Sequence, residues 1–267
     1  MNENRGPAPP AAAGGRGRYS APALEKGLDI LELLAGTAEG LSATEIARRL
    51  GRSVSEIFRM LVALEARGWV RRREADGSYA LTLRLFELAH RHPPIERLLG
   101  LALAEMRDLA ARTGQSCHLA VYEDGRILIV ARVESPLPRG FVVRLAATFD
   151  LLDTASGRVL AAFQPAEERA RRLARALQLA GGVAPPELLS ARLDGIVARG
   201  HEVSPSTAIR GITDLSFPVR DHTGAAVAAL TIPFAEIVGA PLDAVGTAAA
   251  LGEAAFRISS GLGFGEA

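Results

Sequence analysis

The sequence predicts an α+β protein with an N-terminal winged helix-turn-helix, a linker helix, and a C-terminal domain with a largely antiparallel sheet. Three observations lead to this fold class. Start and stop signals for short helices recur up to residue 68, a hairpin signal follows, and beyond residue 114 apolar and polar residues alternate. With 267 residues, 48% of them hydrophobic, the chain has material for two modest domains. We expect a disordered arm at residues 1–22, the winged helix at 23–89, the linker helix at 90–113 and the C-terminal domain at 114–262.

Helices are expected near the start of the chain, where apolar spacing and capping residues agree. The first helix has one apolar face and ends at Gly36; that face holds Leu24, Leu28, Leu31 and Leu34. Ser42 with Glu45, and Ser53 with Glu56, have the spacing of capping boxes. The second and third helices should therefore begin at these serines.

The second and third helices have the arrangement of a helix-turn-helix. Gly51 follows the second helix at a position suited to the left-handed conformation, so only a short turn separates the two. The third helix should end at Gly68, and its expected buried stripe is Val54, Ile57, Leu61 and Leu64. The second helix of such a pair enters the major groove of DNA. The third helix is therefore the expected recognition helix.

A hairpin follows, formed by residues 69–73 and 78–81 around the Asp76-Gly77 turn. Three helices and a hairpin make a winged helix. The net charge of the chain is only +1, but between Arg48 and Arg73 eight arginines stand against Glu56 and Glu65, a local balance of +6. Such a concentration of arginine predicts a polyanionic partner, double-stranded DNA.

The residues expected to contact DNA are Thr44, Arg52, Ser53, Ser55, Glu56, Arg59, Arg71, Arg72 and Arg73. Arg59 faces outward on the recognition helix, where arginine can pair with guanine. Glu56 could cap its helix or accept a hydrogen bond from cytosine, and we favour the cap. The three wing arginines are expected to hold phosphates.

Residues 95–113 predict one helix, ended by Gly114, with an apolar surface too broad for a single packing partner. This breadth favours self-association. The elements expected after it are strands 117–122 and 127–133, strand 141–145, helices 154–163, 167–179 and 186–199, strands 215–220 and 226–233, and helix 242–260.

Motifs of known catalytic centres are absent from the sequence: it has no Gly-x-Ser-x-Gly, no phosphate loop and no His-Glu-x-x-His. The five histidines lack a repeated ligand spacing, and Cys117, the single cysteine, can close neither an intramolecular disulfide nor a cysteine-rich zinc site. Cys117 and His118 point to opposite faces of their strand. No apolar run reaches 18 residues. We expect a cytoplasmic protein without catalytic residues, metal, cofactor or membrane contact.

Several segments are similar to one known family: residues 41–47 and 61–70 with Arg59 between them, residues 131–136, residues 154–158, and residues 199–201. From residue 24 to residue 260 the sequence resembles the IclR family of bacterial transcriptional regulators. The resemblance implies a GAF-like C-terminal domain that binds a small organic effector. It also implies a homodimer, or a dimer of dimers forming a homotetramer, on a near-palindromic operator.

The same resemblance places the effector pocket at Asp153, Thr154, Ala155, Gly157, Ser204, Asp214 and Thr231, with Ser204 on a loop. A helix start at Thr154 offers backbone N–H groups to a carboxylate. Asp153 stands where the family usually has a small residue, and Asp214 where it often has cysteine. Asp153 could be a plain N-cap, and Asp214 could be solvated or paired with an arginine such as Arg210. Alternatively the effector satisfies these acids, which favours an organic acid, amino acid or polyol-like compound.

We therefore expect a sequence-specific DNA-binding regulator, and not an enzyme, whose operator binding a small organic effector modulates. Two other functions stay open. One is an enzyme that uses Asp153 and Asp214 as a carboxylate pair. The other is a ligand-binding module whose winged helix contacts proteins, which the local charge of +6 disfavours. Whether the regulator represses or activates does not follow from these residues.

Overall fold

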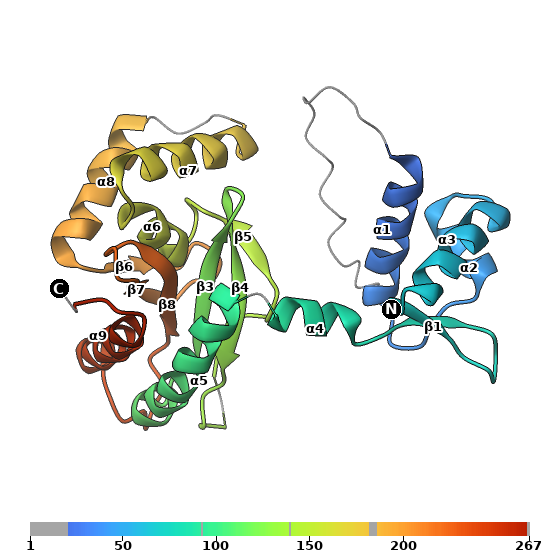
Figure 1. Ribbon diagram of the computed structural model, residues 1–267. Helices are drawn as coiled ribbons and strands as arrows, with labels where there is room; N and C mark the ends of the chain where they lie inside the picture. The colour runs from blue at the N-terminus through green and yellow to red at the C-terminus, as the bar shows by residue number, and fades with distance from the viewer. Residues whose placement is uncertain (1–20, 92, 139, 182–185, 266–267) are drawn as a thin grey trace. The chain divides into compact units, whose positions relative to one another are not determined.

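The computed structural model describes residues 21–91, 93–138, 140–181 and 186–265, and its contacts divide the chain into two units, one ending at Arg91 and one after it (Figure 1). The expected arm lies outside the described residues except for residues 21 and 22, and Pro22 already belongs to the first helix. In the described ranges no helix is long and apolar enough to cross a membrane, and no three acidic, histidine or cysteine side chains form a candidate metal site.

The first unit has the helices and hairpin of a winged helix (Figure 1). Its elements are α1 (Pro22–Ala35), α2 (Ala43–Leu50), α3 (Val54–Ala66), β1 (Val70–Arg72), β2 (Tyr79–Leu81) and α4 (Arg84–His90). Gly51, in the left-handed conformation with φ of 63°, lets α3 follow α2 after a short turn. The buried core consists of Ile30, Leu34, Ile46, Ala47, Ile57, Leu61, Val70 and Tyr79. The predicted helix-turn-helix and wing are confirmed.

Three details of the first unit differ from the sequence predictions. Ser53 and Glu56 form the complete capping box, but at Ser42 only half of one forms, because the Glu45 carboxylate binds Arg48 and Arg49 instead of the cap N–H. Leu24, Leu28 and Val54 were expected on buried faces and are exposed. Leu24 and Val54 lie in the first turns of α1 and α3, whose later residues Ile30, Leu34, Ile57 and Leu61 are the buried ones. The short helix α4 was not predicted.

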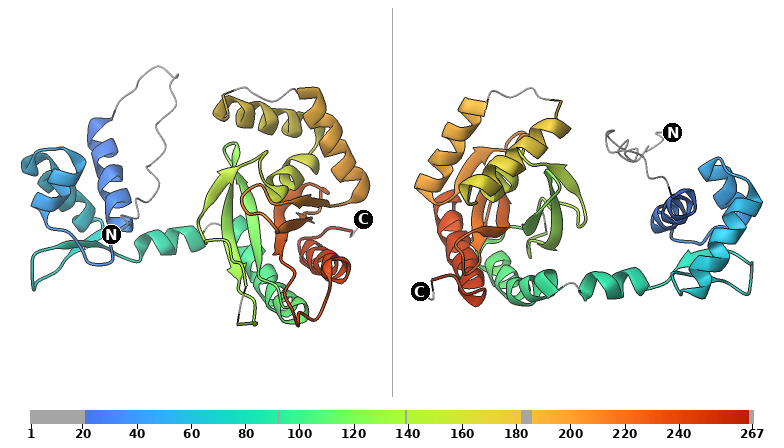
Figure 2. Two further views of the ribbon diagram at one scale, coloured as in Figure 1. Left: turned by 180° about the vertical axis from the view of Figure 1, so that it is seen from behind. Right: turned by 45° about the horizontal axis from the view of Figure 1, so that its top comes forward.

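The second unit is one six-stranded sheet with helices on both faces (Figure 2). Its elements are α5 (Pro93–Thr113), β3 (Cys117–Glu123), β4 (Arg126–Val133), β5 (Thr148–Asp150), α6 (Ala155–Ala162), α7 (Ala166–Leu179), α8 (Pro186–Arg199), β6 (Glu202–Pro205), β7 (Thr213–Arg220), β8 (Ala226–Phe234) and α9 (Ala244–Gly261). The strand order is β5-β4-β3-β8-β7-β6, and each neighbouring pair is antiparallel. The α+β class is thus confirmed.

Two apolar cores lie on opposite faces of this sheet. One packs α5 and α9 against the strands, and the other packs α6 and its neighbours. Cys117 contacts the Met106 carbonyl of α5, whereas the next residue, His118, faces Ser156 of α6. The alternation expected for this strand therefore holds.

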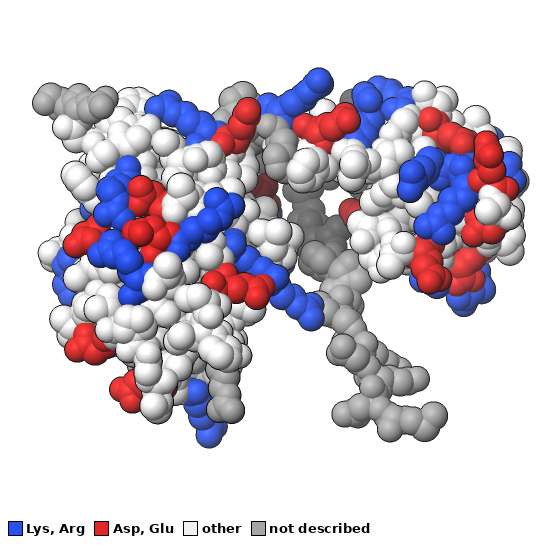
Figure 3. Space-filling model, turned by 90° about the horizontal axis from the view of Figure 1, so that it is seen from below, with Lys and Arg blue, Asp and Glu red and all other residues white. Residues whose placement is uncertain are grey.

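The broad apolar surface of α5 finds its partners inside this unit. Leu98, Ala102, Met106 and Leu109 are buried, and the helix packs on both α9 and the sheet. Ion pairs Arg112–Glu253 and Arg257–Glu105 join the outer faces of α5 and α9, where Figure 3 shows basic and acidic side chains interleaved. The broad apolar surface of α5 is therefore explained by packing within one copy of the chain and does not support self-association.

Two predictions about strands were wrong in the second unit. Residues 141–145 are not a strand; the chain turns at Ala146, whose φ is 60°, and the edge strand β5 forms only after it. Strand β6 was missed, and Ser204 lies on it and not on a loop. Its buried positions hold the polar residues Glu202 and Ser204, so no hydrophobic alternation marks it.

Helix α6 is buried along its whole length, and Gly157 permits its close approach to the preceding turn. A Cβ atom at Gly157 would lie 1.9 Å from the Leu151 carbonyl oxygen. We predict that Gly157→Ala lowers the free energy of unfolding of this unit by about 3 kcal/mol through overpacking. The matched change Gly100→Ala, on an exposed position of α5 with nothing within 4 Å, should raise it by about 1 kcal/mol. Denaturant unfolding measures both, and equal midpoints for the two variants would contradict the packing described.

Candidate functional site

The outward face of α3 is the exposed face that a DNA groove could receive. Ser55 and Arg59 are exposed, and the structure shows no ion pair or hydrogen bond of the Arg59 side chain within its described ranges. The same face carries Val54, Phe58 and Val62 at 46%, 49% and 48% exposure. Apolar side chains of this kind contact thymine methyl groups in the major groove, while arginine pairs with guanine. Sequence reasoning missed Phe58 and Val62; their i, i+4 spacing beside Arg59 was the available signal.

Two of the residues expected to contact DNA, Glu56 and Arg52, instead form ion pairs with residues of α1. Lys26 of α1 binds Glu56 at 2.5 Å, and this bond, with those from Ser53, lowers the pKa of Glu56 to about 2. Glu56 completes the capping box with Ser53, which is the role that the sequence analysis favoured for it. Arg52 binds Asp29 of α1 at 2.9 Å. Both ion pairs hold α1 against the helix-turn-helix. Glu56 and Arg52 are therefore less available to DNA than Arg59.

The remaining candidates lie at the helix starts and on the wing. Thr44 is exposed in the first turn of α2, and Ser53 is exposed but engaged in its capping box. On β1, Arg71 and Arg72 are exposed, and Arg73 beside them is half-buried. The wing thus presents exposed cations at Arg71 and Arg72, which suit phosphate contacts.

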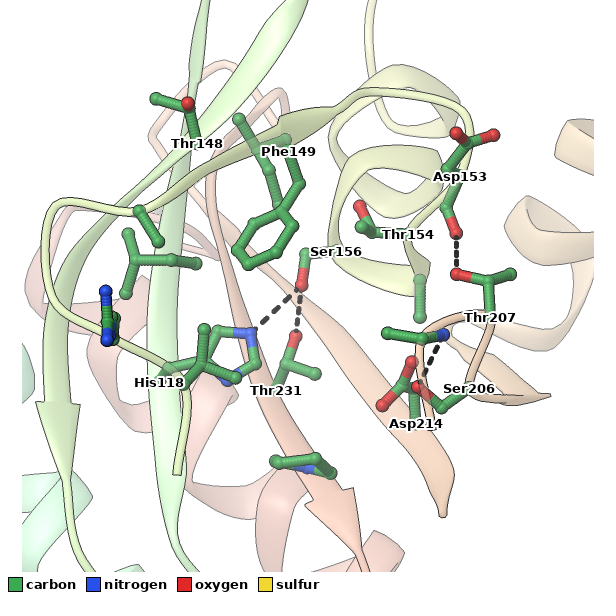
Figure 4. Close-up of a pocket in the computed structure, with 18 of the residues that line it drawn as sticks. His118, Thr148, Phe149, Asp153, Thr154, Ser156, Ser206, Thr207, Asp214 and Thr231 are labelled. Carbon is green, nitrogen blue, oxygen red and sulfur yellow. Dashed lines mark hydrogen bonds between the residues drawn. The ribbon is translucent and has the colours of Figure 1, made fainter. Parts of the chain in front are cut away.

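A cavity of about 950 Å³ opens in the second unit between the start of α6, strands β3 to β5 and the ends of β7 and β8 (Figure 4). Its apolar lining includes Ile127, Ile129, Phe141, Val143 and Phe149. Its polar lining includes His118, Thr154, Ser156, Ser206, Thr207, Asp214 and Thr231. A volume and lining of this kind are typical of sites for small organic molecules.

Most of the expected effector residues meet at this cavity, but two do not. Asp153, Thr154, Ala155, Asp214 and Thr231 line it. Gly157 instead packs on Leu151, with its N–H donating to the Thr154 hydroxyl at 3.0 Å, and Ser204 accepts a hydrogen bond from Arg158 at 2.8 Å. These two residues support the site and do not line it. Sequence reasoning missed His118 and Ser156, and treated His118 as an ordinary histidine.

The two expected acids differ from each other. Thr154, and not Asp153, is the N-cap of α6; the Asp153 side chain is exposed, and its carbonyl accepts from Thr207 at 2.9 Å. Asp214 is half-buried, and burial raises its pKa, although Ser206 and Arg158 act in the opposite direction. Figure 4 shows the two carboxylates apart and pointing in different directions. Within the described residues Asp214 has no ion pair with Arg210, which is exposed. The arrangement does not support a catalytic carboxylate pair.

An ion-pair cluster lies behind the cavity. Arg158 of α6 and Glu202 of β6 are joined at 3.0 Å, with side chains only 3% and 2% exposed. Arg158 also donates to the Leu152 carbonyl at 3.0 Å, and Arg192 and Arg199 of α8 bind the same glutamate. Buried charges need such partners. The cluster therefore fixes the first turns of α6 against β6 and α8.

Buried polar side chains also connect the floor of the cavity. His118 Nε2 lies 3.4 Å from the Ser156 hydroxyl, which lies 2.9 Å from that of Thr231, and Thr231 in turn lies 2.7 Å from Ser216 (Figure 4 shows the first two contacts). Burial lowers the pKa of His118 to about 4. His118 is therefore neutral at neutral pH.

Comparisons with known proteins give matches in both units of the chain. Residues 23–74 match the IclR helix-turn-helix domain, and residues 96–260 match the C-terminal domain of the bacterial transcriptional regulator IclR. The chain is 31% identical to a glycerol operon regulatory protein of Streptomyces coelicolor, over 78% of this chain and 83% of that protein. It is 26% identical to the HTH-type transcriptional regulator KdgR of Escherichia coli, over 88% and 90%.

Solved structures give the same result. The IclR of Thermotoga maritima matches with a TM-score of 0.69 and 27% identity, covering 90% of this chain and 98% of that one. An IclR homologue of Microbacterium hydrocarbonoxydans, solved with 4-hydroxybenzoate, matches with a TM-score of 0.70 and 25% identity at the same coverages.

The lowered pKa of His118 predicts a specific pH dependence of stability. From its ordinary value of 6.5 down to about 4, the unfolded chain binds a proton at this residue that the folded chain does not. The free energy of unfolding should therefore fall by about 2 kcal/mol from this residue alone between pH 7 and pH 5. His118→Gln removes that loss while other titrating groups stay the same. Denaturant unfolding of both proteins at the two pH values tests this, and identical pH dependence would show that His118 titrates normally.

Proposed function

The chain belongs to the IclR family of bacterial transcriptional regulators, and we propose that its winged helix at residues 23–89 binds a near-palindromic operator under control of an effector held at residues 114–262. It is a DNA-binding transcriptional regulator and not an enzyme. Because its operator lies on the chromosome, we place it in the cytoplasm.

The observation that carries DNA recognition is the outward face of α3. Arg59 stands there among exposed apolar side chains, whereas the neighbouring charged candidates Arg52 and Glu56 are held by α1. A folded protein exposes a row of large apolar residues on a helix at some cost unless a partner covers it. A major groove with guanine and thymine edges is a partner that suits both kinds of side chain.

The proposal of effector binding rests on the cavity in the second unit, which has one apolar wall and one polar wall. Its apolar wall suits a carbon skeleton, the start of α6 offers N–H groups to an acceptor, and Asp214 offers an acceptor to a donor. We infer an effector with a carboxylate or similar group at one end and a hydroxyl or ammonium group at the other. Organic acids, amino acids and polyol-like acids have this pattern, as does the 4-hydroxybenzoate bound by the Microbacterium hydrocarbonoxydans homologue.

We also propose that the regulator acts as a homodimer or a dimer of dimers. A single winged helix makes few base contacts, and a two-fold dimer would read related half-sites. The first unit exposes Leu83, Leu85 and Leu88 on and beside α4, at 76%, 41% and 45%. This apolar segment, and not the broad surface of α5, supports self-association.

Arg59 and Arg72 should act differently on DNA. Arg59→Ala should remove about 1 to 3 kcal/mol of discrimination between operator and other DNA, because it breaks a base contact. Arg72→Ala should weaken binding to all sequences and reduce the log-log salt slope by about 0.9, because it breaks a phosphate contact. Gel shifts at several salt concentrations, with DNA from beside the protein's own coding region, measure both.

Arg107→Ala, an exposed arginine of α5, is the matched control and should change neither quantity. If Arg59→Ala kept the operator preference while Arg72→Ala abolished it, this division of roles would be wrong.

Asp214 should determine which effectors act. Asp214→Asn removes the charge that receives an ammonium or hydroxyl group, so it should weaken the effector response about ten-fold and leave effector-free DNA binding unchanged. Thermal shift with amino acids, hydroxy acids and simple keto acids, followed by gel shift with those that bind, measures the two effects. Should only plain monocarboxylates such as pyruvate or glyoxylate stabilise the protein, and Asp214→Asn bind them equally well, Asp214 has no such role.

A further inference from the structure

The four polar side chains at the floor of the cavity contain one more hydrogen than their mutual contacts can use. Ser216, Thr231 and Ser156 each carry one hydroxyl hydrogen, and neutral His118 carries one on its ring. These four hydrogens serve three contacts: His118 to Ser156, Ser156 to Thr231, and Thr231 to Ser216. All four residues are buried, and among the described residues their side chains have no further hydrogen bond.

Two of the four positions are poor places for this hydrogen. If it were on His118 Nδ1, it would be a buried donor without an acceptor, since that atom is enclosed and has no partner. If it were on Ser216, it would lie on a fully buried residue that does not line the cavity. The hydrogen therefore belongs to Ser156 or Thr231, which both line the cavity.

Ser156 is the better of the two because of its place in α6. It is the second residue of the helix, after Ala155, and the first N–H groups of a helix have no acceptor within it. Thr154 takes the N–H of Gly157, while those of Ala155 and Ser156 have no acceptor among the described residues. An acceptor atom placed here would receive the hydroxyl and the backbone donors together. Thr231, on a paired strand, has no such neighbours of its own.

We propose that Ser156 accepts hydrogen bonds from His118 Nε2–H and from the Thr231 hydroxyl and donates its own hydrogen to a carboxylate or carbonyl oxygen of the effector. Every hydrogen of the four side chains then has an acceptor when the effector is bound. Ser156 thereby selects acceptor-ended ligands at this end of the cavity, while Asp214 selects donors elsewhere in it. This assignment rests on the proposed role of the cavity as the effector site.

The test uses two ring compounds that differ at one end, 4-hydroxybenzoate and 4-hydroxybenzylamine. Calorimetric titration of the full-length protein should give a dissociation constant at least ten-fold lower for the acid than for the amine. Ser156→Ala should weaken binding of the acid by about ten-fold, the effect of losing a hydrogen bond to a charged group. Ser216→Ala, the same chemical change on the same chain of contacts but away from the cavity, should stay within about two-fold.

The other outcomes each give a definite answer. If Ser156→Ala, folded by circular dichroism, binds the acid as tightly as the parent, the proposal is wrong. If Thr231→Val loses the acid and Ser156→Ala keeps it, the spare hydrogen is on Thr231 and the assignment is again wrong. The comparison of acid and amine in the parent needs no variant, and equal or reversed affinities overturn the selection. If neither compound binds the parent, the effector role of the cavity fails, and the role of Ser156 falls with it.

Discussion

The burial of α6 is the constraint from which most of the second unit follows. All eight residues of this helix are buried, so each of its polar groups must find a partner within the unit or in a ligand. Arg158 donates hydrogen bonds to Glu202, Ser204 and the Leu152 carbonyl. Glu202 also forms ion pairs with two arginines of α8. A buried ion pair of this kind contributes little net stability, because desolvation offsets the attraction. Its main effect is to hold the start of α6 in place at the edge of the cavity.

The first unit uses its charges in a different way. Lys26–Glu56 and Arg52–Asp29 tie α1 to the helix-turn-helix, and because they are partly exposed, each stabilises the unit only modestly. Their effect is that the charged side chains beside α3 are already paired, while Arg59 is left available. Specificity of DNA binding therefore depends on which arginines are paired within the protein as much as on how many there are, and the local charge of +6 overstates the number that can reach DNA.

Sequence reasoning succeeded where one local rule decides the structure and failed where tertiary contacts do. The cap at Ser53 and the left-handed Gly51 mark helix ends through groups that lie close together along the chain. Strand β6 was missed because Glu202 and Ser204 are buried polar residues whose partner, Arg158, comes from a distant helix. Residues 141–145 alternate like a strand, but the lining of the cavity explains their apolar side chains. Gly157 was assigned to a ligand although it is required by the approach of Leu151.

The four polar side chains on the floor of the cavity use all but one of their hydrogens in contacts with one another, and we assign the remaining hydrogen to Ser156. The tautomer of His118 tests this directly, since the claim requires the hydrogen on Nε2 and a lone pair on the unpartnered Nδ1. Long-range proton–nitrogen NMR of the ligand-free protein at neutral pH reports which nitrogen is protonated. We expect neutral His118 with its hydrogen on Nε2. A hydrogen on Nδ1 would make Ser156 donate to Nε2, leave Ser156 no hydrogen for the effector, and contradict the account.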